Sequence, residues 1–188
     1  MRELTEAQKT AFKLYKGNNP FLGQLCFAEF LNASLGQGCA LPDAWEAQAT
    51  ELDGLIRGSL LTSATYLYRA MPDAYLAPHI KAEELRYPAY MSTAGDEYAI
   101  RRHFSSSSRG LAAAKLCIEC DIGTPALDME MDATFGGMEQ ELLLPRGSTF
   151  RVDGIEEVTD PLRMAELMTP LYAKNYSMLK IYQLRFLA

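Results

Sequence analysis

The sequence lacks the long apolar runs that mark membrane proteins. None of its 188 residues lie in an uninterrupted apolar stretch of about 18, the length at which a membrane-spanning helix becomes a candidate. Its first ten residues, MRELTEAQKT, also lack the basic-then-apolar order of a cleavable signal peptide. We therefore expect a soluble protein that makes no membrane contact, and its secretion would use a route that needs no cleavable signal.

A surplus of basic residues is missing as well. The chain has 18 Lys and Arg against 24 Asp and Glu, which gives a formal net charge of −6. Proteins that bind nucleic acids without sequence preference depend on excess positive charge to neutralise phosphates, so no nucleic-acid partner is expected. A small anionic ligand is compatible with this balance, because a few well-placed arginine side chains suffice locally.

Cysteine is scarce, and the spacing of the four cysteines is not that of a metal site. Cys26 and Cys39 lie far from Cys117 and Cys120 in the chain. The last two form a Cys-x-x-Cys pattern, for which a redox pair or a zinc site is the alternative. However, KLCIECDI alternates like a strand, and strand positions three apart point to opposite faces. We therefore expect reduced thiols, no metal, and a reducing compartment at the site of action.

The first third of the chain has the periodicity of helices. Thr5 and Gln8 form a capping-box pattern ahead of a helical stripe in residues 4–16, and the turn-forming residues 17–20 end it. Helical spacing continues through residues 21–35 and again through residues 41–61, where a Pro-Asp pair suits the first turn. Residues 1–63 are therefore expected to form a helical lobe.

From residue 64 onward the chain becomes rich in strand-forming residues. The strand candidates are ATYLYRAM, LCIECDI, the pair joined within QELLLPRGSTFRVDGIEEV, and MLKIYQLRFLA at the end. Helices followed by mostly antiparallel strands are typical of an α+β domain. We find no internal repeat, and the length suits one core. A single domain over residues 1–188 is expected, with residues 64–188 as its β-rich part.

Three local patterns on these strands carry chemistry, and each has an ordinary structural alternative. Glu139 and Glu141 would share one strand face about 7 Å apart, as pairs on a solvated face also do. Arg69 could grip a phosphate with its planar fork or extend to the edge of the sheet. Ser92 and Thr93 could cap a helix, or one hydroxyl could steady a carboxylate.

Read together, four segments follow one another in a fixed order. They are Tyr68-Arg69-Ala70, then YMSTA at residues 90–94, then Phe104, and finally EQELLLPRGSTF at residues 139–150. This order resembles the Arg, Ser-Thr-Ser, Glu-x-Glu signature of the mono-ADP-ribosyltransferases of bacterial toxins and effectors and of vertebrate ecto-enzymes. The resemblance spans the chain and implies a helical lobe followed by a mostly antiparallel two-sheet core around an NAD cleft.

The resemblance also implies a role for each residue in releasing nicotinamide from NAD. The reaction passes through an oxocarbenium-like ribose, which the charge of Glu141 would stabilise while Ser92 holds that carboxylate in place. Arg69 would bind a phosphate. The other implied NAD contacts are the backbone of Ala70, Thr93, Phe104 stacked on the nicotinamide, and Arg109, for which an exposed loop charge is the alternative. NAD is the substrate, and no metal is implied.

The first glutamate of the motif bears on the acceptor. Family members with Glu at this position usually modify arginine, because a guanidinium needs a base or charge partner to attack the ribose. We therefore expect transfer to an arginine of a target protein, with Phe135, Met138 and Glu139 implied in acceptor recognition. The resemblance to secreted effectors implies action in the cytosol of a host or target cell. We expect a monomer, but the sequence does not determine the oligomeric state.

Three departures from the family pattern keep the acceptor open. Ala70 replaces a glycine, and Ala94 replaces a serine. Gly136 occupies a position where acceptor-recognising members often have an aromatic residue, and the nearest aromatic, Phe135, lies one place earlier. A Ser or Thr hydroxyl, another acceptor, or water in an NAD glycohydrolase are the alternatives. A binding module without turnover is the least favoured, because the residues that carry the charge chemistry are all present.

Overall fold

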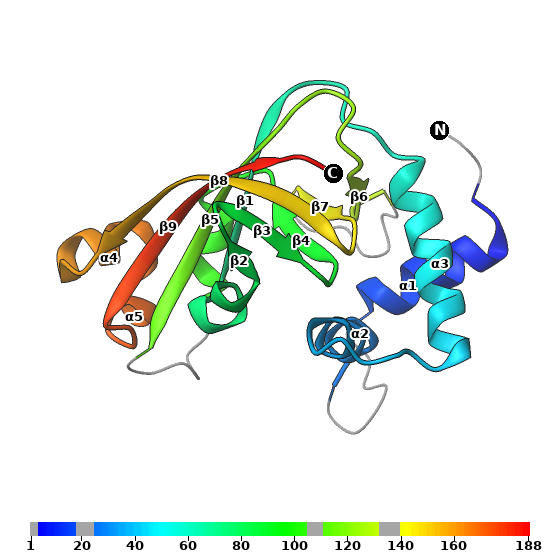
Figure 1. Ribbon diagram of the computed structural model, residues 1–188, viewed down its shortest axis with the longest axis horizontal. Helices are drawn as coiled ribbons and strands as arrows, with labels where there is room; N and C mark the ends of the chain where they lie inside the picture. Colours follow the sequence, from blue (N-terminus) through cyan, green and yellow to red (C-terminus); the bar gives the residue numbers. More distant parts are fainter. Residues whose placement is uncertain (1–3, 18–24, 105–110, 132–139) are drawn as a thin grey trace.

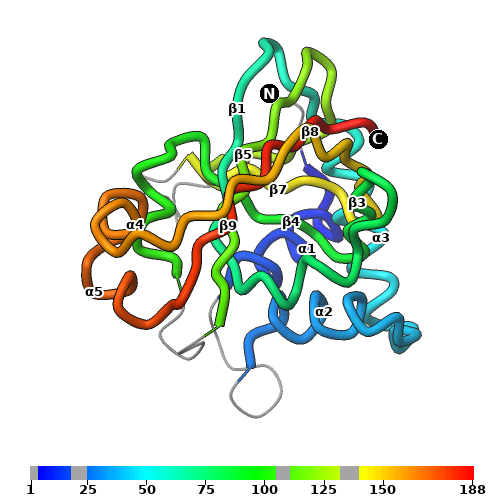
Figure 2. The backbone as a smooth tube through the Cα atoms, turned by 60° about the vertical axis from the view of Figure 1, so that its left-hand side comes forward, coloured from blue at the N-terminus to red at the C-terminus, as the bar shows by residue number. Residues whose placement is uncertain are grey.

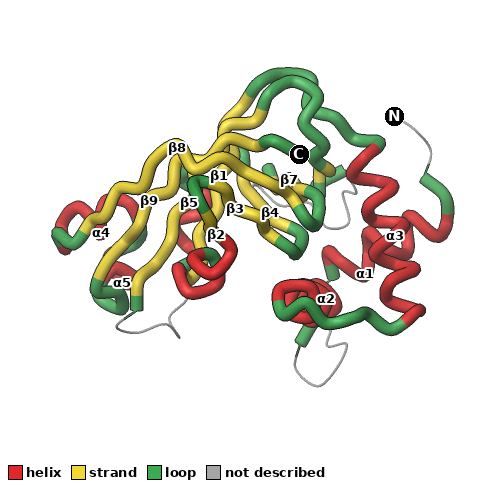
Figure 3. Tube along the Cα trace, in the orientation of Figure 1, coloured by secondary structure: helices red, strands yellow, loops and turns green. Residues whose placement is uncertain are grey.

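The computed structural model describes residues 4–17, 25–104, 111–131 and 140–188. Three helices lie beside a strongly curled sheet (Figure 1). Two short helices lie at the other end of the sheet, as the turned view in Figure 2 also shows. The three helices of the lobe precede the strands in the chain and occupy their own part of the molecule, whereas the shorter helices lie against the sheet (Figure 3). The predicted α+β class and the N-terminal helical lobe are confirmed.

The helical lobe consists of α1 (Glu6–Lys16), α2 (Phe27–Gly36) and α3 (Asp43–Arg57). The predicted capping box is present, because the Thr5 hydroxyl accepts a hydrogen bond from Gln8 N at 3.2 Å and the Gln8 side chain accepts one from Thr5 N at 3.2 Å. Helix α2 begins later than the sequence pattern suggested, and residues 18–24 lie outside the described part of the chain.

The lobe shares a hydrophobic cluster with the sheet. Phe12 and Tyr15 of α1 and Leu31 of α2 pack with the buried residues of α3. Tyr90 and Leu143 from the sheet belong to the same cluster. Burial of an aromatic side chain in such a cluster contributes about 1.5–3 kcal/mol. The lobe is therefore fixed against the strands that carry the candidate site.

The described strands form one sheet in the order β2-β3-β8-β9-β5-β1-β4-β7-β6. Only the pairing of β5 with β9 is parallel among these neighbours. The strands are β1 (Thr65–Pro72), β2 (Ile80–Lys81), β3 (Glu84–Tyr87), β4 (Met91–Ala94), β5 (Ala112–Cys120), β6 (Leu127–Asp128), β7 (Glu141–Leu144), β8 (Ser148–Val158) and β9 (Met178–Phe186). The shorter elements are η1 (Asp73–Tyr75), η2 (Ala77–His79), η3 (Ala99–Arg102), α4 (Pro161–Leu167) and α5 (Pro170–Ala173).

The expected two sheets are joined into one. Strand β1 pairs along its whole length with β5, but it meets β4 at the single register pair Tyr68–Ala94. One half of the sheet therefore contains β5 and β1, and the other contains β4, β7 and β6. The sequence indicated the strands, but it did not show that β1 uses both of its edges and so links the two halves.

The structure confirms that Cys117 and Cys120 point to opposite faces of β5 and that neither forms a disulfide. Cys120 lies in the cluster on one face of β5, and Cys117 packs against the cluster on the other face. All four cysteines are free thiols, and burial raises the pKa of Cys120 to about 12. A high pKa leaves little thiolate at neutral pH, so this thiol is a weak nucleophile.

In the described residues, no group of three or more His, Cys, Asp or Glu side chains is arranged to hold a metal ion. In the same part of the chain, each helix is too short or too polar to cross a membrane.

Candidate active site

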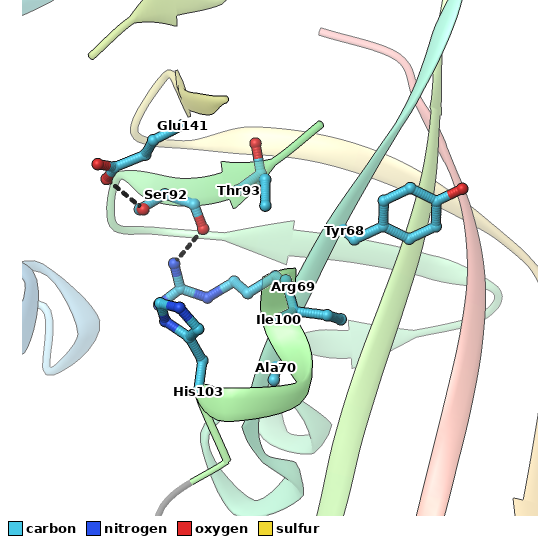
Figure 4. Close-up of a pocket in the computed structure, with 9 residues that line it drawn as sticks. Tyr68, Arg69, Ala70, Ser92, Thr93, Ile100, His103 and Glu141 are labelled. Carbon is cyan, nitrogen blue, oxygen red and sulfur yellow. Dashed lines mark hydrogen bonds between the residues drawn. The ribbon is translucent and has the colours of Figure 1, made fainter. Parts of the chain in front are cut away.

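A pocket of about 310 Å³ lies where β1, β4, β7 and η3 meet (Figure 4). Its walls come from segments far apart in the sequence: Tyr68, Arg69, Ala70, Ser92, Thr93, Ala94, Ile100, His103 and Glu141. The crossing of β1 and β4 at Tyr68–Ala94 places the Arg69 and Ser92 segments side by side. Arg69, Ala70, Ser92, Thr93 and Glu141, which the sequence singled out, therefore border one cavity.

The Ser92 hydroxyl donates a hydrogen bond to Glu141 Oε1 at 2.6 Å. This contact follows from the antiparallel register of β4 and β7, in which Ser92 pairs with Leu143 and Ala94 with Glu141. Residues two apart on one strand share a face, so Ser92 and Glu141 are diagonal neighbours on the pocket side. Ser92 thus lies within a strand and supports the carboxylate, and the helix-cap alternative is wrong.

A second partner of Glu141 comes from the helical lobe. Lys16, in the last turn of α1, forms an ion pair and hydrogen bond with Glu141 Oε2. The side chains of Lys16 and Glu141 are 18% and 17% exposed. Sequence reasoning missed Lys16, because the only available signal was a cation at a helix C-terminus, where the helix dipole favours cations in any protein.

Arg69 points along the pocket wall, away from the edge of the sheet. Its Nη1 donates to the Ser92 carbonyl at 2.6 Å, and Figure 4 shows its guanidinium beside the ring of His103. Its Nε is buried and has no hydrogen-bond partner among the described residues. A buried N–H without a partner costs about 1–3 kcal/mol, so the guanidinium has capacity left for an anionic ligand.

The structure places Phe104 away from the pocket. Its side chain is 2% exposed and packs edge-on against Tyr176, with ring centroids 6.2 Å apart. The turn at η3 directs this apolar ring into the core beneath α4 and α5, and Ile100 and His103 border the pocket instead. In this structure Phe104 therefore does not lie where it could stack on a nicotinamide in the pocket.

Thr93 and Ala70 border the pocket in different ways. The Thr93 hydroxyl donates to the Leu142 carbonyl at 2.7 Å, so it reinforces the pairing of β4 with β7. Ala70 borders the pocket beside Arg69, and its small side chain also packs against the buried cluster that contains Phe104. The other predicted site residues, Arg109, Phe135, Met138 and Glu139, lie outside the described residues.

A second, smaller pocket of about 220 Å³ lies next to Gln140, the residue between the two motif glutamates. Its lining includes the carboxylates of Asp128 and Glu130. Gln140 adopts the left-handed conformation with φ of 49°, and its carbonyl accepts a hydrogen bond from Gly95 N at 3.1 Å. A Cβ at Gly95 would approach Gln140 Oε1 to 2.9 Å, so glycine permits this close contact.

An ion-pair cluster holds the lobe against the strand that carries Ser92. Arg146 Nη2 donates to Asp53 at 2.8 Å and to Glu46 at 2.7 Å, both on α3. Tyr90, which directly precedes β4, donates its hydroxyl hydrogen to Asp53 at 2.7 Å. Burial, together with the neighbouring Asp53 carboxylate, raises the pKa of Tyr90. Because Tyr90 lies two residues before Ser92, this cluster helps to fix the start of the site strand.

A family model described as ADP-ribosyltransferase exoenzyme matches residues 1–174. No curated protein matches the sequence significantly.

Solved structures of similar fold include the following toxins. Plx2a, an ADP-ribosyltransferase toxin from Paenibacillus larvae, is 16% identical, with 98% of this chain and 88% of that chain covered and a TM-score of 0.65. The Clostridium limosum C3 exoenzyme is 16% identical over 99% and 87%, with a TM-score of 0.65. C3stau2 from S. aureus, solved with NAD, is 17% identical over 98% and 88%, with a TM-score of 0.61. At these identities the likeness concerns the fold.

Proposed function

The chain belongs to the ADP-ribosyltransferase exoenzyme family, whose donor substrate is NAD, and we propose that it transfers ADP-ribose to an arginine side chain of a target protein. Transfer of ADP-ribose from NAD is the activity of the family. The arginine acceptor and the role of each site residue are the new parts of the proposal. Glu141 is assigned as the catalytic carboxylate, Ser92 as its support and Arg69 as the phosphate-binding residue.

The observation that carries the proposal is the hydrogen bond between Ser92 and Glu141 in the pocket that Arg69 also lines. A carboxylate held at a fixed position stabilises a positive charge that develops next to it, and this contact strengthens toward the transition state. A guanidinium in the same pocket offers two parallel N–H donors to a phosphate. The two groups together suit NAD, whose diphosphate would lie at Arg69 and whose reacting ribose would lie at Glu141.

The proposed transfer replaces one bond at ribose C1′ with another, and it requires neither a metal ion nor a redox partner. The bond between ribose C1′ and the nicotinamide nitrogen breaks, and its electron pair leaves with nicotinamide. The ribose then carries the oxocarbenium charge, which Glu141 stabilises. A guanidinium nitrogen of the acceptor forms the new bond to C1′ and loses one proton, which Glu139 is proposed to accept.

The remaining NAD contacts belong to the same proposal. The backbone at Ala70, beside Arg69 in the pocket wall, would bond the nicotinamide amide. Thr93, whose hydroxyl joins β4 to β7, would help to hold these strands beside the ribose of NAD. Arg109 would provide a second phosphate contact. Phe104 would need to leave its buried position to reach the nicotinamide, and Ile100 already provides an apolar surface in the pocket.

Two observations favour arginine as the acceptor. The motif has Glu at its first position, residue 139, where a carboxylate can pair with a guanidinium. The smaller pocket beside Gln140 is lined by Asp128 and Glu130, which makes the neighbourhood attractive to a cation. Phe135 and Met138 would contact the protein that carries this arginine. A Ser or Thr hydroxyl on the target, or water in a glycohydrolase reaction, is the second candidate.

The proposal is tested by incubating the protein with labelled NAD in a cell lysate and identifying the labelled peptides by mass spectrometry. We expect ADP-ribose on an arginine of one or a few proteins. Label on a hydroxyl would change the acceptor and leave the transferase assignment in place. Free nicotinamide without labelled protein would mean a glycohydrolase, and neither product would mean a binding module.

The setting of the reaction follows the same proposal. The matching family is described as an exoenzyme family, and the similar structures are toxins, so we propose a target protein in a host cytosol and delivery by secretion. We further propose that the enzyme works as a monomer.

A further inference from the structure

We propose that Lys16 is a positioning residue of the active site: its ammonium group holds the Glu141 carboxylate in one orientation before NAD binds. The inference rests on the proposed role of Glu141, and it adds a residue from the helical lobe to a site otherwise built from the sheet. Lys16 acts through Glu141, so it is not itself assigned to the reacting atoms.

The first argument is the geometry of the carboxylate. Glu141 Oε1 accepts the Ser92 hydroxyl at 2.6 Å, and Oε2 accepts the Lys16 ammonium. The two donors come from β4 and α1, and these act on different oxygens of one group. A carboxylate held at both oxygens cannot rotate freely, so the orientation of Glu141 depends on Lys16 as much as on Ser92.

The second argument is that the helix bearing Lys16 is fixed in place. The neighbouring residue, Tyr15, is buried and accepts a hydrogen bond from Asn32 Nδ2 at 2.9 Å. Asn32 also accepts the backbone N–H of Tyr90 at 3.1 Å, and the rings of Tyr15 and Tyr90 pack edge-on at 5.6 Å. This contact links α1, α2 and the start of β4. The end of α1 is therefore held at the distance that Lys16 needs to reach Glu141.

The third argument is the partial burial of the contact. The side chains of Lys16 and Glu141 are 18% and 17% exposed. An ion pair that is mostly shielded from solvent is stronger than one at the surface, so this contact holds the carboxylate firmly.

Two other charged neighbours of Glu141 bond to backbone groups. The Arg69 guanidinium is directed to the Ser92 carbonyl, and Glu130 accepts a hydrogen bond from the backbone N–H of Glu141 at 3.4 Å. Among the described residues, Lys16 is the cation that bonds directly to the carboxylate.

The test is steady-state release of nicotinamide, with kcat and KM determined separately. We expect Lys16→Met to lower kcat about tenfold, because the carboxylate loses one of its two orienting partners, and to change the KM for NAD less. Lys16→Arg keeps a cation within reach and should restore most of the wild-type kcat. Lys13→Met, at an exposed lysine one turn earlier in α1, is the matched control and should behave as wild type. A kcat for Lys16→Met within about twofold of wild type would overturn the proposal.

A second measurement needs no activity. A double-mutant cycle of Lys16→Met and Glu141→Gln compares unfolding midpoints in urea for the NAD-free protein, so that the two effects can be tested for additivity. We expect them to be non-additive, with a smaller second effect once the first partner has been removed. Additive effects would overturn the contact. If the wild-type protein released no nicotinamide, the proposed function would fail, while this cycle would still decide whether Lys16 and Glu141 are coupled.

Discussion

Replacement of Ser92 by alanine would remove the hydroxyl that bonds to Glu141 Oε1 at 2.6 Å and leave Lys16 as the other partner of the carboxylate. A hydrogen bond to a charged group contributes about 1.5–3 kcal/mol. If this energy serves to position Glu141 for the transition state, its loss lowers kcat by about ten- to hundredfold, since each 1.36 kcal/mol is roughly a factor of ten. The affinity for NAD should change less, because Arg69, the proposed phosphate-binding residue, is untouched.

The assay is steady-state release of nicotinamide at saturating NAD, with unfolding by urea measured in parallel. Ser148→Ala is the matched control, because this buried hydroxyl also makes one hydrogen bond, to the Pro145 carbonyl at 2.7 Å, and lies outside the pocket lining. The control should lose about 1 kcal/mol of stability and keep its kcat. A Ser92→Ala enzyme whose kcat stays within about twofold of wild type would refute the reasoning.

Three further changes test other parts of the site. Arg69→Lys should raise the KM for NAD about tenfold, because lysine cannot bond a phosphate with two parallel donors, and an unchanged KM would remove Arg69 from the phosphate site. Glu139→Ala should reduce transfer to protein much more than hydrolysis of NAD, as measured by label on protein against free nicotinamide; equal losses would contradict separate roles for Glu139 and Glu141. Arg146→Met should lower the free energy of unfolding by about 2–3 kcal/mol, because it leaves carboxylates of α3 without their cation. The hydrogen bond from Arg146 also holds the pKa of the Glu46 carboxyl below its usual value. The ion pair therefore stabilises the protein at neutral pH, and this stabilisation is lost as the pH falls through the lowered pKa of Glu46. The measurement is the free energy of unfolding in urea from pH 7 to pH 3. The same pH dependence in Arg146→Met as in the wild type would contradict the prediction.

The part of the fold that could be predicted depends on local patterns. The Thr5–Gln8 capping box specifies the start of α1 within a few residues, so it was visible in the sequence and is present in the structure. The alternation in β5 likewise separated Cys117 from Cys120 correctly. Which strands pair is a property of distant segments, and for that reason the joining of the two halves of the sheet through β1 was not predicted.

The same distinction applies to the site. Arg69, Ser92 and Glu141 were found because their motifs occur in a fixed order, and the structure brings them into one pocket. Phe104 was assigned by its position in that order alone, yet an apolar ring next to a core is stabilised by burial, and the structure buries it. Lys16 could not be found, because its contact with Glu141 depends on how the helical lobe docks on the sheet.

The most direct test of the account is nicotinamide release from NAD by the wild-type protein and by Glu141→Gln, which keeps the shape of the side chain and removes its charge. The account predicts measurable release by the wild type and a rate at least about a hundredfold lower for the variant, with both proteins folded. Similar rates for the two proteins would contradict the claim that a negative charge held by Ser92 in this pocket drives the cleavage of NAD.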